Sequence, residues 1–201
     1  TYEDACARAG ATPRVTAEIP IGWDPTDLKA HFDRMVPRAF VPRDDRTHFV
    51  YTGTVLPMGG DTLRAVLQAA RLVRDRAPEL RDAFRFHFFG TSNQTAGGPP
   101  RVGPHAEAAG VADIVREHPP RLDYLDALTT LREADILLLL GSTEPHYTAS
   151  KVFPSLLAER RLLGVYHEAS TAVDILSRAA GASVDLVTFG GRVSVGDLSL
   201  I

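Results

Sequence analysis

The amino-acid sequence predicts an α/β protein, a Rossmann-like three-layer domain with a doubly wound parallel sheet of about six strands. Two observations support this fold class. Short apolar and β-branched runs alternate along the chain with longer segments that have helical spacing, as βα units do. The run from Ile136 to Leu140 is apolar without alternation, which is typical of a central parallel strand covered on both faces.

Six segments are predicted to be strands, and each of them ends near a turn or loop signal. They are Thr47 to Gly53, Phe84 to Gly90, Asp113 to Arg116, Asp135 to Leu140, Leu162 to Tyr166 and Val184 to Phe189. Helical crossovers between them would build one doubly wound sheet.

Helices are predicted where apolar residues recur with a period near 3.6. One apolar face comprises Leu63, Val66, Leu67, Ala70 and Val73, with Asp61 as the expected N-cap. A second stripe comprises Leu122, Leu125, Leu128 and Leu131. Two further helices are expected from Lys151 to Arg161 and from Thr171 to Ala180, the last one closed by Gly181.

The remaining segments are assigned by composition. Residues 91–104 are rich in Gly, Pro, Ser and Thr and are predicted to form a mobile or functional loop. Residues 1–46 contain a short helix, an extended stretch from Arg14 to Ile19 and a helix from Thr26 to Phe32. We expect residues 1–46 to be a linker and the trailing edge of a missing N-terminal domain, 47–190 to be the Rossmann-like domain, and 191–201 to be a tail.

Composition and missing motifs exclude several classes of function. The chain has 201 residues and a net charge of −3, with both signs interspersed, which disfavours a general nucleic-acid binder. No apolar run approaches the length of a membrane span. Cys6 is the one cysteine, which fits a cytoplasmic protein. Glycine-rich phosphate loops, G-x-S-x-G and H-E-x-x-H are absent, and so is D-x-D, so we expect neither a metal nor a cofactor.

Ligands of open α/β sheets bind beyond the carboxyl ends of the strands. The loop from Ser142 to Lys151 is the one most dense in chemistry there, with Glu144 as a candidate acceptor for sugar hydroxyls. Ser150 and Lys151 at a helix start predict a diphosphate site. The alternative is that Ser150 is only an N-cap and Lys151 a solvated charge. Gly53 and Gly90 can likewise be simple turns, and His118 and His146 ordinary surface or core histidines.

The ordered set of motifs resembles the C-terminal domain of GT-B-fold, group 1 (retaining) glycosyltransferases. Ile19 to Asp24 resembles the interdomain stretch of that family. Its strand and turn motifs are similar to Phe49–Gly53, Phe86–Gly90, Leu122–Leu128 and Ala134–Leu139, and its "PSKLFEYLA" helix start is similar to Ala149–Phe153 with Leu156–Ala158.

This resemblance implies a domain that binds a nucleoside diphosphate-sugar and transfers the sugar to an unknown acceptor, without a metal. The base would lie near Glu117 and His118, and the phosphates near Gly53, Thr54, Ser150 and Lys151. In that family the acceptor and any catalytic base come largely from the N-terminal half. The fragment alone is therefore expected to be inactive.

The sequence departs from the family at five positions. Thr54 and Met58 stand where two phosphate-neutralising cations are common, and Pro154 replaces the carboxylate that holds the ribose. Glu159 and Arg161 replace a Gly and a Pro. These departures leave open a non-catalytic binding or scaffold module with a degenerate site. A third hypothesis is a flavodoxin-like or epimerase-like sugar-nucleotide enzyme, for which a strand order of 2-1-3-4-5 would be expected.

Overall fold

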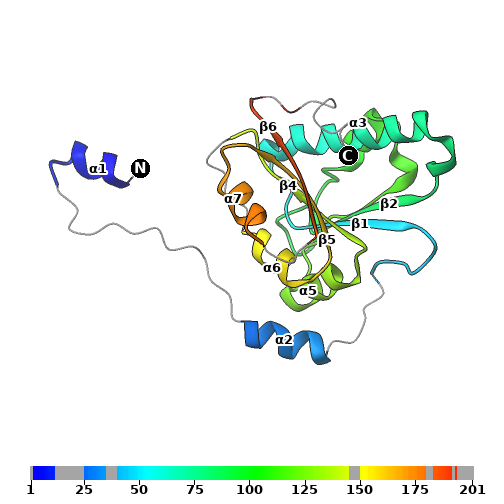
Figure 1. Cartoon of the computed structure of the whole chain (residues 1–201), viewed down its shortest axis with the longest axis horizontal. Coiled ribbons are helices and arrows are strands. Elements are labelled where there is room, and N and C mark those ends of the chain that lie inside the picture. Colours follow the sequence, from blue (N-terminus) through cyan, green and yellow to red (C-terminus); the bar gives the residue numbers. More distant parts are fainter. Residues whose placement is uncertain are drawn as a thin grey trace.

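A single six-stranded parallel sheet forms the centre of the molecule (Figure 1). The computed structural model describes residues 2–11, 25–34, 40–144, 150–179, 183–191 and 193. The strands are β1 (Thr47–Thr52), β2 (Phe84–Phe89), β3 (Val115–His118), β4 (Ile136–Leu140), β5 (Arg161–His167) and β6 (Val184–Phe189), in the order β3-β2-β1-β4-β5-β6. The predicted fold class is confirmed, and the order 2-1-3-4-5 is excluded.

The helices that connect the strands cover both faces of the sheet (Figure 1). They are α3 (Gly60–Arg76), α4 (Gly103–Ala108), α5 (Tyr124–Glu133), α6 (Val152–Leu157) and α7 (Thr171–Ser177), with 3-10 turns at Pro57–Gly59, Pro78–Leu80 and Ala112–Ile114. Two more helices, α1 (Tyr2–Arg8) and α2 (Pro25–Arg34), precede β1. None of these helices is long and apolar enough to cross a membrane.

Two apolar clusters, one on each face of the sheet, make up the core. The first joins α3 and α4 to the sheet through residues such as Leu63, Leu67 and Phe88. The second lies under α5, α6 and α7 and includes Leu128 and Leu162. Because β4 lies in the middle of the sheet, its side chains contribute alternately to both clusters, which explains its run of leucines.

Several predicted element boundaries are wrong. β3 begins two residues later than expected, because a 3-10 turn occupies Ala112–Ile114. The helix predicted from Lys151 ends at Leu157, and Arg161 already belongs to β5. The first residue of α3 is Gly60 and its N-cap position is Gly59, so Asp61 lies inside the first turn and pairs with Arg64.

The two predicted apolar faces are partly wrong at their ends. Val73 is 40% exposed near the end of α3, and Leu125 is 54% exposed near the start of α5. The remaining members of the two stripes are buried or partly buried.

The segment before β1 packs against the second core. His31 Nε2 lies 3.2 Å from Thr129 Oγ1, and the Arg132 guanidinium lies 4.9 Å from the centre of the Phe32 ring. Helix α2 therefore docks on α5. The stretch from Arg14 to Ile19 and Gly181 lie outside the described residues, and the proposed domain boundaries stay predictions.

Candidate functional site

A cleft of about 640 Å³ opens at the carboxyl edge of the sheet, beyond β1 and β2. This volume lies in the range typical of small-molecule sites. The cleft is lined by Thr52, Gly53, Thr54, Phe89, Gly90, Asn93, Thr95, Arg121, Leu122, Asp123, Tyr124, Ala127, Leu128, Leu131, Ser150, Lys151 and Pro154. Five of the seven residues predicted to bind the donor, Gly53, Thr54, Gly90, Ser150 and Lys151, are thus brought together.

Lys151 holds its ammonium group against the end of β1. Its Nζ donates to the Tyr51 hydroxyl oxygen at 2.6 Å and to the Thr54 carbonyl oxygen at 3.4 Å. The Tyr51 hydroxyl in turn donates to the same carbonyl at 3.0 Å. The ammonium also lies 4.3 Å from the centre of the Tyr51 ring, close enough for a cation–π contact. These contacts give the charge a defined position.

The ammonium of Lys151 has no carboxylate within salt-bridge distance among the residues that the structure describes. Burial lowers the pKa of Lys151 to about 8 because the charged form loses solvation. A partly buried cation without a counter-ion is a favourable partner for an anionic ligand. The interpretation of Lys151 as a solvated surface charge is therefore wrong.

Gly53 and Gly90 bring the loops after β1 and β2 close together. Both have positive φ, 112° and 68°, a region that favours glycine. A Cβ at Gly53 would lie 2.7 Å from Lys151 Nζ, and one at Gly90 would lie 3.7 Å from Gly53 Cα. The glycines are turn residues, and Gly53 also makes the space that the ammonium occupies.

Helix α6 contributes less than the sequence predicts. Its N-cap position is Lys151, without a side-chain cap, so Ser150 is not the N-cap. The helix has six residues, too few for a substantial dipole. Pro154 lies in its first turn, where the missing N–H costs little, and it lines the cleft. The family that the sequence resembles commonly has a carboxylate at this position.

His118 and Glu144 are not among the residues that line the cleft. The His118 carbonyl oxygen accepts from the Gly90 N–H at 2.8 Å, and its exposed imidazole lies beside Phe89. The Glu144 N–H donates to Ser142 Oγ at 3.0 Å. His146, from the same loop as Glu144, lies outside the described residues.

Glu117 has a structural role instead of contacting a base. Its carboxylate accepts from Thr91 Oγ1 at 2.5 Å and from the N–H groups of Arg101, Val102 and Gly103 at 2.8, 3.0 and 2.8 Å. These bonds tie the loop predicted at 91–104 to β3 and satisfy N–H groups at the start of α4. The loop prediction is corrected at its end, since α4 already begins at Gly103.

Sequence reasoning missed four residues of the site. The sequence pattern assigns Tyr51 only to a strand, although a phenol near the end of a strand can reach the loop that follows. Arg121, Asp123 and Tyr124 line the far side of the cleft and are all exposed. Their signal was available, because a basic, an acidic and an aromatic residue directly follow the loop after β3.

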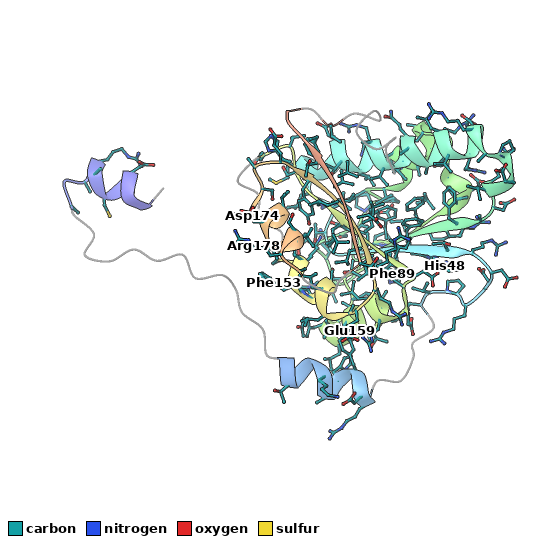
Figure 2. All side chains as sticks on the ribbon, viewed as in Figure 1. His48, Phe89, Phe153, Glu159, Asp174 and Arg178 are labelled. Atoms are coloured by element: carbon teal, nitrogen blue, oxygen red, sulfur yellow. The ribbon has the colours of Figure 1, made fainter. Side chains whose placement is uncertain are left out.

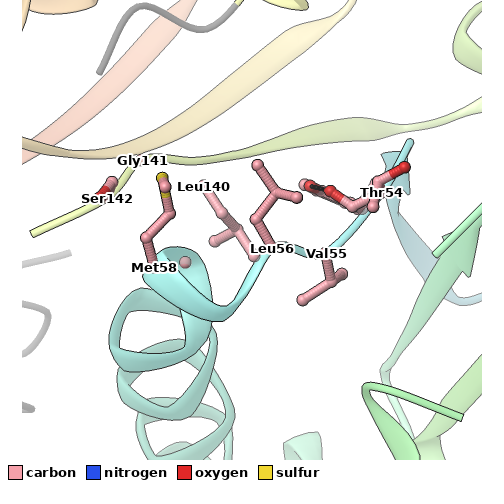
Figure 3. A pocket seen from close by; sticks show the side chains of 9 residues that line it. Thr54, Val55, Leu56, Met58, Leu140, Gly141 and Ser142 are labelled. Carbon is pink, nitrogen blue, oxygen red and sulfur yellow. Dashed lines mark hydrogen bonds between the residues drawn. The ribbon is translucent and has the colours of Figure 1, made fainter. Parts of the chain in front are cut away.

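A second cavity of about 10 Å³, enough for roughly one water molecule, lies beside the start of α3 (Figure 3). Leu56 and Met58 line it together with Leu140 and Gly141. An apolar side chain thus occupies the position of Met58, where the family that the sequence resembles often has a cation. No group of three or more His, Cys, Asp or Glu residues in the described part of the chain is arranged to hold a metal.

No family model and no curated protein matches the sequence. Solved structures do match. The apo structure of OtsA has a TM-score of 0.58 and 14% identity, over 83% of this chain and 39% of that chain. A UDP-forming α,α-trehalose-phosphate synthase from Burkholderia vietnamiensis has a TM-score of 0.55 and 13% identity, over 83% and 40%. The C-terminal domain of a glycosyl transferase group 1 family protein, LpcC, from Francisella tularensis has a TM-score of 0.50 and 10% identity, over 76% and 71%.

These similarities establish the fold. The chain spans about two fifths of the length of the two synthases and most of the LpcC domain. Its fold is that of a glycosyltransferase C-terminal domain, as the sequence motifs predicted.

Proposed function

We propose that the chain is the donor-binding part of a glycosyltransferase and binds a nucleoside diphosphate-sugar in the 640 Å³ cleft. One observation carries this proposal: the Lys151 ammonium, with no carboxylate partner among the described residues, is fixed beside Gly53 in the cleft. The glycosyltransferase fold supports the choice of ligand, and so does the similarity to a UDP-forming synthase.

Lys151 would neutralise the diphosphate and stabilise the charge that develops on it when the sugar leaves. The Tyr51 hydroxyl and the Thr54 carbonyl oxygen hold the ammonium before a ligand arrives, so little reorganisation is required. A positioned cation would stabilise the departing diphosphate without a metal. The acceptor and any general base would come from a second domain.

Calorimetry with UDP, GDP and ADP tests this function. We expect at least one of them to bind, and Lys151→Ala to weaken that binding about tenfold or more, since a charge-assisted contact contributes about 1.5–3 kcal/mol. Lys29 is the only other lysine in the chain and is exposed, paired with Asp33. Lys29→Ala is therefore the matched control and should bind as the unmodified chain does. Absence of binding by all three nucleotides would contradict the proposal.

A second candidate function is a sugar-nucleotide-binding module without catalysis. Pro154 in the cleft and Met58 in the small apolar cavity favour it, because both replace groups that would hold the donor. Hydrolysis or transfer of the donor sugar, measured on a protein that includes an N-terminal domain, distinguishes the two. A module would bind the nucleotide and leave the sugar attached.

A further inference from the structure

The far side of the cleft carries three side chains that the diphosphate contact does not use. Arg121, Asp123 and Tyr124 all line the cleft, and all three are exposed. Tyr124 is 65% exposed, the most of the large apolar or aromatic side chains found exposed in the described residues. Exposed aromatic rings beside a ligand cleft offer a surface on which a base can stack.

Asp123 is at the N-cap position of α5 but does not act as a cap. Aspartate commonly accepts a hydrogen bond from the first turn of its helix. Here no side-chain cap bond is formed, and the residue contributes its backbone carbonyl to the Ala127 N–H at 2.9 Å. No described residue makes a hydrogen bond or ion pair with its carboxylate. Its acceptor oxygens are therefore available to a ligand in the cleft.

The guanidinium of Arg121 is similarly uncommitted in the described part of the chain, where only its backbone N–H is bonded, to the Gln94 carbonyl oxygen at 3.2 Å. Its five donors suit a ligand edge that carries adjacent acceptors. Arg121 and Asp123 thus present donors and acceptors side by side in the chain, next to an aromatic ring.

The distance from Lys151 to this group suits a nucleotide. Lys151 contacts the end of β1, whereas Arg121 to Tyr124 follow β3, two strands away in the sheet. Two strand spacings amount to about 10 Å. A diphosphate at Lys151 therefore places an attached nucleoside over Gly90 and its base against Arg121, Asp123 and Tyr124.

Resting on the function proposed above, we propose that this cleft selects guanine, with Asp123 as the residue that determines the choice. Guanine presents two adjacent donors, N1–H and N2–H, which match the two oxygens of a carboxylate. It also presents the O6 and N7 acceptors that an arginine binds in pairs. Uracil has one ring N–H between two carbonyl oxygens, which a carboxylate repels. Adenine lacks an N–H at N1. Guanine therefore offers a pair of adjacent donors to the carboxylate and a pair of acceptors to the arginine, which neither uracil nor adenine does.

Calorimetry with GDP, inosine diphosphate, UDP and ADP tests this inference. Inosine diphosphate differs from GDP only by the missing N2 amino group, so it should bind about tenfold more weakly, the worth of one charge-assisted hydrogen bond. UDP and ADP should bind more weakly still. Asp123→Asn should weaken GDP binding and remove most of the difference between GDP and inosine diphosphate. Asp174→Asn, at an exposed aspartate on α7, is the control and should leave both affinities unchanged.

The two proposals fail in different ways. Guanine selection would be overturned by any of three results: equal binding of GDP and inosine diphosphate, tighter binding of UDP or ADP, or an unchanged preference in Asp123→Asn. A loss of affinity in Lys151→Ala would still support the diphosphate site. Inorganic pyrophosphate separates them further. Its binding should depend on Lys151 and not on Asp123. Failure of every diphosphate to bind would overturn both.

Discussion

One ammonium group, that of Lys151, supplies the positive charge at the end of β1 in the cleft. It is held there by Tyr51 and by the Thr54 carbonyl oxygen, and Gly53 leaves room for it. The family that the sequence resembles often has two further cations, at the positions of Thr54 and Met58. The cleft should therefore depend on Lys151 more strongly than a site with several shared positive charges.

The pH dependence of nucleotide binding should follow this lysine. Burial lowers the pKa of Lys151 to about 8, so the ammonium loses its proton as pH rises through that value. A bound diphosphate favours the charged form and raises the pKa again. Affinity should therefore fall from about pH 7.5 to 9.5, and binding in this window should take up a proton. Calorimetry in buffers of different ionisation enthalpy measures the uptake, and a flat affinity across the window would contradict the assignment.

Glu159 has a backbone conformation that glycine adopts more easily. It is the one non-glycine residue with positive φ in the described part of the chain, 53°, in the connection between α6 and β5 (Figure 2). The family that the sequence resembles usually has glycine at this position. The strain of the Cβ atom is worth about 1–2 kcal/mol, and the exposed ion pair with Arg132 offsets little of it.

Comparison of Glu159→Gly with Glu159→Ala isolates this strain, because neither variant can form the ion pair with Arg132. We expect the glycine variant to have the higher free energy of unfolding, by about 1 kcal/mol, after the greater chain entropy of glycine is allowed for. Denaturant titration measures it. An alanine variant as stable as the glycine variant would show that the left-handed conformation is not maintained.

At the scale of elements, β1 and β2 are joined by a buried pair of histidines. His48 Nδ1 and His87 Nε2 lie 2.9 Å apart, and His48 Nε2 lies 3.1 Å from Asp44 Oδ1 (His48 is labelled in Figure 2). Both side chains are buried, and the two residues occupy diagonal positions of the paired strands. If both imidazole rings were protonated, two positive charges would lie in contact.

This pair should make the fold sensitive to acid. Burial, together with the charges of His48 and of Arg116, lowers the pKa of His87 to about 4. In the unfolded chain the pKa of His87 is near 6.5, so the unfolded chain takes up this proton at a higher pH than the folded chain does. Protonation therefore favours the unfolded chain as pH falls below 6.5. The free energy of unfolding should fall by up to about 3 kcal/mol as pH drops from 6.5 to 4.

Urea unfolding at a series of pH values measures this slope in the unmodified chain and in His87→Gln. The variant should lose most of the slope between pH 6.5 and 4, although its stability at neutral pH is also expected to decrease. His118 is exposed, so His118→Gln is the control and should keep the slope. An identical slope in all three chains would assign the acid sensitivity to carboxylates instead.

Element types and most strand ends were predictable from the sequence, whereas the ends of β3 and of the helices were not. The β1, β2, β4, β5 and β6 segments are predicted to within one residue at each end, because each is a short apolar run. The predicted helix from Lys151 failed at its end because Arg160 and Arg161 fit the polar face of a helix as well as the start of a strand. In the structure, Arg161 pairs with Asp185 across the β5–β6 ladder.

For the whole molecule, the fold fixes where the site lies. A parallel sheet gathers the segments after β1, β2 and β4 at one edge, so five of the predicted residues meet in one cleft. Strand neighbours and side-chain directions are not encoded in local spacing. For that reason the sequence did not show that Glu117 anchors the 91–104 loop. Asp123 and Tyr124, which line the cleft, were visible in the sequence as a polar and aromatic cluster after β3, but their position in the cleft was not.

The central claim, that a nucleoside diphosphate binds at Lys151, is tested most directly by protection of this lysine from chemical modification. The chain contains two lysines, so mass spectrometry of peptides labelled with an amine-reactive reagent reports on each of them separately. A saturating nucleoside diphosphate should slow labelling of Lys151 several-fold and leave Lys29 unchanged. Equal labelling of Lys151 with and without GDP, UDP and ADP would contradict the claim.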